Sequence, residues 1–76
     1  MENITRLYTA RLENWFVDNK SGCLIGNIYD DEIKRWEDGQ KIKTSKILPM
    51  SAQTETPKEG ALISTMNSVY LLGKKG

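Results

Sequence analysis

Hydroxyl and amide side chains that could hold a small polar ligand gather in two short stretches of the chain. One stretch is the Thr-Ser pair near the middle, and the other begins at Ser64 and is followed by an aromatic ring. Such groups can orient a phosphorylated ligand without reacting with it, and neighbouring lysines would meet its phosphate. The predicted binding residues are Lys43, Thr44, Ser45, Lys46, Thr65, Asn67 and Tyr70. Asn67 and Ser68 are equally typical of a tight turn, which explains them without a ligand.

Basic side chains offer a second kind of binding surface, for nucleic acid. The candidates are Arg35, Lys41, Lys43, Lys46, Lys74 and Lys75. Tyr29 and Trp36 are close enough in sequence to add stacking surfaces, the combination that single-stranded nucleic acid uses. Eleven Lys and Arg against ten Asp and Glu give a net charge of only +1, however, and lysines also protect the edges of sheets. A nucleic-acid-binding module is therefore the alternative prediction.

The sequence contains few of the residues that usually carry out catalysis. There is no histidine, and the single cysteine, Cys23, has no base beside it in sequence. The acidic residues of the segment 30–38 do not have the spacing of a calcium loop, and acids also suit the start of a helix. We therefore expect a non-enzymatic protein without a cofactor or a metal.

Turn signals at short intervals predict a run of short strands. The expected strands are 12–17, 23–29, 41–48, 61–66 and 69–72, with hairpins over 18–22 and over Asn67-Ser68. Ile42 and Ile47 have opposite parity, so a β-bulge near Thr44-Ser45 is needed to turn both inward. The predicted fold is mainly β: a small curled antiparallel sheet or barrel of about five strands with one short helix.

The short helix is expected over residues 30–39, where acids come first, Ile33 and Trp36 are three apart, and Gly39 ends the segment. Residues 1–11 fit a helix or a strand about equally well. Ser51–Gly60 is expected to be a flexible loop and Gly73–Gly76 a tail.

The chain of 76 residues predicts one small domain, 1–76. Hydrophobic burial and chain ordering nearly cancel at this size, so we expect a homo-oligomer, with Trp15, Phe16 and Trp36 in the core or between subunits. The longest apolar runs are too short to cross a membrane, no signal peptide is recognisable, and one cysteine suits a reducing compartment. A cytoplasmic protein without membrane contact is expected.

The order of motifs resembles a family of small proteins carried by bacteriophages and prophages. The shared pattern is a tryptophan strand at Trp15, Gly-x-Ile-Tyr at 26–29, Asp38-Gly39, Ile-x-Thr-Ser at 42–45, and Thr-x-Asn-Ser-x-Tyr-x-Leu-Gly at 65–73. Trp36 stands where the family usually has phenylalanine, and the Ser51–Gly60 loop is longer than usual.

The resemblance implies a phage accessory protein that acts in the cytoplasm of the host cell. Such proteins bind and block a host defence factor or sequester a defence signalling nucleotide. Together with the residues above, this makes a non-enzymatic binding protein that counteracts host defence our leading prediction, with the nucleic-acid-binding module as the alternative.

Overall fold

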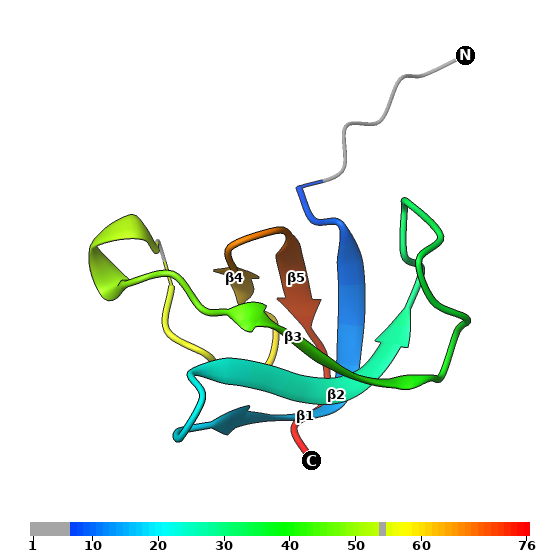
Figure 1. The fold of residues 1–76 in the computed structure, drawn as a ribbon, viewed down its shortest axis with the longest axis horizontal. Coiled ribbons are helices and arrows are strands. Elements are labelled where there is room, and N and C mark those ends of the chain that lie inside the picture. The colour runs from blue at the N-terminus through cyan, green and yellow to red at the C-terminus, as the bar shows by residue number, and fades with distance from the viewer. Residues whose placement is uncertain (1–6, 54) are drawn as a thin grey trace.

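The computed structural model describes residues 7–53 and 55–76, whose strands form one curled sheet (Figure 1). The strands are β1 (Ala10–Asp18), β2 (Cys23–Tyr29), β3 (Lys41–Lys46), β4 (Leu62–Ser64) and β5 (Val69–Leu72). A single turn of 3-10 helix, η1 (Met50–Ala52), is the only helical element in this part of the chain. The prediction of a mainly β protein with five strands is confirmed.

The sheet has the order β3-β2-β1-β5-β4 and is mixed, because β5 pairs with β1 in parallel. The other ladders are antiparallel. Five strands that alternate in direction leave the first and the last pointing the same way, so these two can only pair in parallel. The isolated bridge between Ile47 and Thr65 joins β3 to the end of β4, but the sheet does not close into a barrel. The expected purely antiparallel arrangement is therefore corrected.

A β-bulge in β1 decides which of its side chains enter the core. Between the pairs Glu13–Asn27 and Phe16–Ile25 the register advances one residue further on β1 than on β2. Asn14 absorbs the extra residue in the left-handed region, with φ 50°, which asparagine tolerates better than most residues. The bulge turns Trp15 inward and leaves Phe16 outside.

The predicted bulge in β3 is present. The pairs Ile25–Lys43 and Cys23–Lys46 show one extra residue on β3, at Thr44-Ser45. Ile42 is buried as a result, and Ile47 packs against the core from the other side of the bulge. The parity of two isoleucines thus predicted a backbone irregularity correctly.

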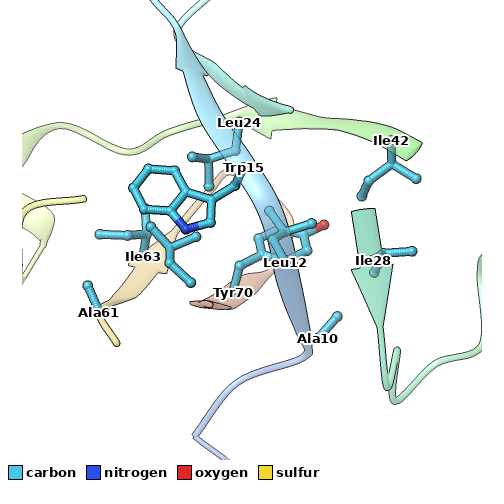
Figure 2. Packing of buried hydrophobic residues seen from close by; sticks show 10 residues of the cluster. Ala10, Leu12, Trp15, Leu24, Ile28, Ile42, Ala61, Ile63 and Tyr70 are labelled. Carbon is cyan, nitrogen blue, oxygen red and sulfur yellow. The ribbon is translucent and has the colours of Figure 1, made fainter. Parts of the chain in front are cut away.

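The core is one cluster that receives side chains from all five strands. Figure 2 shows side chains from β1, β2 and β5 converging on one interior around the Trp15 indole. That indole is 1% exposed, and its Nε1 donates to the carbonyl of Gly73 over 2.9 Å, so its polar atom is satisfied. The cluster contains Ala10, Leu12, Trp15, Leu24, Ile28, Ile42, Ala61, Ile63, Tyr70 and Leu72.

The helix predicted over residues 30–39 is wrong, and the segment forms turns instead. Asp30 and Lys34 have φ values of 54° and 55°, which a right-handed helix cannot contain. The carboxylate of Asp31 accepts hydrogen bonds from the backbone N–H groups of Ile33 and Arg35, at 3.4 and 2.7 Å. The short Asp31 side chain thus binds backbone N–H groups that would otherwise be available to the backbone carbonyls of a helix.

Other boundaries also differ from the predictions. β1 begins at Ala10 and so settles part of the segment 1–11 as strand, whereas Ile4 lies outside the described residues. The expected tail lies along β1: Gly73 N donates to the Leu12 carbonyl at 2.7 Å, and Gly76 N to the Trp15 carbonyl at 2.9 Å. Part of the expected flexible loop is attached to the edge of the sheet at β4. The Gln53 side-chain amide donates to the Ser64 carbonyl and accepts from the Ser64 N–H.

Replacing Gly26 by alanine tests how tightly the β1 bulge is packed. A Cβ at this position would lie 3.0 Å from the Glu13 carbonyl oxygen and 3.1 Å from Trp15 Cα, both backbone atoms. We expect Gly26→Ala to lower the free energy of unfolding by about 2 kcal/mol, measured by urea denaturation. Gly60→Ala is the control, since open space surrounds that position and only its φ of 87° opposes alanine. It should cost about 1 kcal/mol; equal losses would contradict the packing argument.

Candidate functional site

The first candidate site is the solvent side of β1, β2 and β3, here called the outer face. Alternation along each strand, corrected for the two bulges, sends one set of side chains away from the core. The outer face contains Arg11, Glu13 and Phe16 of β1, Ile25, Asn27 and Tyr29 of β2, and Lys41 and Lys43 of β3. Phe16 is 41% exposed, which is unusual for so large an apolar side chain.

A cation lies beside the Tyr29 ring, whereas Ile25 separates Lys43 from Phe16. The Arg11 guanidinium carbon is 5.0 Å from the centre of the Tyr29 ring, and Lys43 flanks Ile25, the cross-strand partner of Phe16. Arg11 also contacts the Glu13 carboxylate, Nε to Oε2 at 2.9 Å. Arg11 Nη1 also lies 3.6 Å from a carboxylate oxygen of Asp30. The outer face therefore combines flat rings with cations, and two of these cations, Arg11 and Lys43, have acidic partners.

Lys43 has a loose partner at the far end of the face. Its Nζ lies 3.8 Å from the Asp18 carboxylate, which also accepts a hydrogen bond from the Ser21 hydroxyl at 2.7 Å. The Ser21 hydrogen bond, followed by backbone and Lys43 contributions, lowers the pKa of Asp18 below its ordinary value in spite of some desolvation. Such an exposed ion pair contributes little to stability, so Lys43 can exchange it for a phosphate.

The other basic residues do not join Lys41 and Lys43 in one patch. Arg35 is engaged by Asp31 in the connection that follows β2, and Lys75 places its Nζ 5.7 Å from the Trp15 ring. Lys46 lies beside Gly22, at the hairpin of β1 and β2. The sequence therefore predicted a larger basic surface than the fold assembles.

The residues predicted to bind a polar ligand separate into two sets. Thr44, Thr65 and Tyr70 are buried, and their hydroxyl groups bond within the protein. Ser45 and Asn67 lie at the surface, where the Asn67 amide donates to the Ser45 hydroxyl. Lys46 is exposed next to this pair, and its carbonyl accepts from Met66 N at 2.9 Å, whereas Lys43 belongs to the outer face.

A cavity that the sequence did not indicate is the second candidate site. It has a volume of about 470 Å³ and lies in the connection between β2 and β3. Its lining residues are Asp31, Lys34, Arg35, Trp36, Glu37, Asp38 and Gln40. The helix interpretation hid this cavity; the available signal was a tryptophan flanked on both sides by charged residues, in a segment that ends in Asp-Gly.

An ion pair between Asp31 and Arg35 shapes this cavity. Arg35 Nε lies 3.1 Å from Asp31 Oδ2 and Nη2 lies 3.2 Å from Oδ1, and the Asp31 side chain is only 2% exposed. Arg35 also reaches β5, where Nη2 donates to the Tyr70 hydroxyl at 3.4 Å; Nη1 donates to the Ser68 hydroxyl at 3.0 Å. The pair therefore fixes the connection to the opposite half of the sheet.

The ionised form of this pair is favoured. Burial alone would raise the pKa of Asp31, but the hydrogen bonds from the Arg35 side chain and backbone and the charge of Arg35 outweigh it and lower that pKa. For Arg35 burial works in the opposite direction, yet Asp31 and Tyr70 raise its pKa. The guanidinium then stacks on Trp36, with Cζ 4.4 Å from the ring centre.

Within the described ranges 7–53 and 55–76, no arrangement of residues indicates a metal site or a reactive cysteine. These ranges contain no group of three or more Cys, Asp or Glu residues placed to hold a metal ion, and Cys23 is buried. Two acids of the segment 30–38 bind backbone N–H groups instead: Asp31, as described above, and Asp38, which accepts from Asp30 N at 2.9 Å.

No known protein family matches the chain, and neither the curated proteins nor the solved structures include one that is significantly similar to it. In the described part of the chain, no helix is sufficiently long or apolar to span a membrane.

Thr44→Val tests the part that this hydroxyl plays in the fold. Thr44 Oγ1 accepts from the Leu24 N–H at 3.0 Å and donates to the Ser45 carbonyl at 2.7 Å. Valine would leave a buried N–H unpaired, so we expect the free energy of unfolding to fall by about 2 kcal/mol in urea denaturation. Thr44→Ser keeps the hydroxyl and should lose less than half as much. Similar losses for both variants would mean that the methyl group, not the hydroxyl, stabilises the bulge.

The Asp31–Arg35 pair predicts a dependence of stability on pH. Because folding lowers the pKa of Asp31, its stabilisation is complete above the unfolded value of about 4 and is lost as pH falls through the lowered folded value. Asp31→Asn should lower the free energy of unfolding at neutral pH by about 2–3 kcal/mol, since Arg35 is partly exposed. In urea denaturation, the difference from wild type should shrink below about pH 4. Glu32→Gln, an exposed neighbour, should change neither quantity; a constant difference at all pH values would contradict the assignment.

Proposed function

We propose that this chain is a non-enzymatic binding protein that holds single-stranded nucleic acid on its outer face. The observation that carries the proposal is the exposed Phe16 ring on a strand surface that also presents Tyr29, Lys41 and Lys43. Stacking of a base on such a ring contributes about 1–3 kcal/mol and works for every base, because each has a π-face. Rings beside cations therefore suit a strand of unspecified sequence.

The spacing of the two rings fits an extended strand. Phe16 pairs with Ile25, and Tyr29 is four residues further along β2. At about 3.3 Å per residue the rings are roughly 13 Å apart. Bases that contact both rings must therefore belong to nucleotides that are not adjacent, and the backbone between them passes Lys41 and Lys43.

The charges of the outer face favour moderate affinity. Arg11, Lys41 and Lys43 offer three phosphate contacts, but Arg11 already pairs with Glu13 and Asp30, and Lys43 with Asp18. With two or three phosphates neutralised, the logarithm of the binding constant should fall against the logarithm of salt with a slope of about −1.5 to −2. We therefore expect binding to be tightest at low salt. This binding depends on the cations of the outer face and not on the net charge of +1 of the whole chain.

The resemblance to small phage proteins supports a biological setting for this binding. In the host cytoplasm, a protein that covers single-stranded nucleic acid withholds it from a defence factor that must detect it. Sequestration of a defence signalling nucleotide is the second candidate. The observation that favours it is the surface contact between Ser45 and Asn67, which brings together two of the predicted ligand residues. Self-association of the chain stays a prediction.

Phe16→Ala tests the outer face. We expect it to weaken binding of a labelled oligo-dT about tenfold in fluorescence anisotropy at about 50 mM salt, because one stacking surface is lost. Phe16→Trp should keep the affinity. Met50→Ala removes another exposed apolar side chain, 58% exposed and outside β1–β3, and should change nothing. Absence of binding by the wild type at low salt, or equal weakening by Phe16→Ala and Met50→Ala, would exclude this function.

A further inference from the structure

The cavity between β2 and β3 borders the outer face. Gly39 forms the border: its carbonyl accepts from the Asn27 amide of the outer face at 2.9 Å, and a Cβ on Gly39 would lie 3.7 Å from the Tyr29 hydroxyl. The residues on either side of Gly39, Asp38 and Gln40, line the cavity. A nucleotide strand that stacks on Tyr29 would therefore lie close to residues that line the cavity.

We propose that this cavity receives one unstacked guanine base from the strand bound on the outer face. The inference rests on the proposed function and adds base selectivity to it. Proteins that recognise single strands splay bases out, stack them on aromatic rings or guanidinium planes, and bond their edges. The cavity volume of about 470 Å³ lies within the range of small-molecule sites.

A flat and rigid surface for the base is already in place. The Arg35 guanidinium lies on Trp36 at 4.4 Å, and Asp31 fixes its orientation through two hydrogen bonds. Trp36 is in turn packed against the hydrophobic core. Because the guanidinium is fixed before a ligand arrives, a base that stacks on it costs little further ordering.

The polar groups of the wall favour a base rich in donors. Asp31 is neutralised by Arg35, which leaves Glu37 and Asp38 against Lys34 and gives these three a net charge of −1. Within residues 7–53 and 55–76, the Glu37 carboxylate has no bonded partner. Guanine carries two adjacent N–H donors on its Watson–Crick edge, which match the two oxygens of a carboxylate. Adenine and cytosine offer one amino group beside an acceptor, and thymine offers one imide donor between two carbonyls.

A phosphate is a poor occupant of the cavity itself. Two carboxylates would repel it, whereas the exposed Lys34 can meet the backbone phosphate that follows the inserted nucleotide. This distribution of charge places the base inside and the sugar-phosphate backbone outside. A strand that carries a guanine should therefore bind more tightly than one without.

The test compares three labelled oligonucleotides of equal length by fluorescence anisotropy: an all-dT strand, the same strand with one central dG, and one with central deoxyinosine, which lacks the 2-amino group. We expect the dG strand to bind on the order of tenfold more tightly than the dT strand, with inosine in between. Glu37→Gln should abolish the preference for dG and leave the affinity for dT unchanged. Glu32→Gln, an exposed carboxylate of the same connection that does not line the cavity, should keep it.

Each outcome has a separate meaning. If the wild type binds none of the strands at low salt, the proposed function fails. If it binds all three equally, or if Glu37→Gln retains the dG preference, the outer face still binds nucleic acid and the guanine assignment is overturned. Tighter binding of the deoxyinosine strand or of the dT strand than of the dG strand likewise overturns it. Thermal unfolding of Glu37→Gln, whose altered side chain is exposed, verifies that the variant is folded.

Discussion

The carboxylate of Asp31 determines the shape of the whole connection between β2 and β3. It accepts two backbone N–H groups and two guanidinium donors, and Arg35 extends this network to Ser68 and Tyr70. Taking a charged pair out of water costs several kcal/mol per ion, roughly what the attraction returns. What the structure shows of this pair is positional: it holds in place a segment that carries two left-handed residues, Asp30 and Lys34.

Two β-bulges have a comparable influence on the sheet. A one-residue change of register sends every later side chain of a strand to the opposite face. The bulge at Asn14 therefore lets Leu12 and Trp15 both enter the core and leaves Phe16 in solvent. The bulge at Thr44-Ser45 does the same for Ile42 and Ile47. Of the outer face, the Phe16 ring depends on the β1 bulge, because Arg11, Tyr29, Lys41 and Lys43 share a side without it.

Sequence reasoning predicted what depends on local patterns. The bounds of β2 and β5 were correct, and so was the bulge of β3, because alternation and turn residues act over a few positions. The parallel pairing of β1 with β5 and the cavity depend on contacts between distant segments. The helix prediction failed because acids at a helix start and an Asp31 side chain that binds N–H groups two and four residues ahead look alike in sequence. For the same reason Thr44 and Thr65 were predicted as ligand residues, although their hydroxyl groups satisfy buried backbone donors.

The rigidity of both sites sets the kind of binding that the molecule can achieve. The backbone of the outer face lies in paired strands, and the Asp31–Arg35 ion pair orders the cavity. We therefore expect little backbone conformational entropy to be lost when a ligand binds. Three cations and two rings still limit the affinity of a single copy. Several copies on one strand, or copies joined to each other, would raise the apparent affinity through effective concentration without any new contact. The proposed binding of a long strand would therefore gain affinity from the predicted self-association.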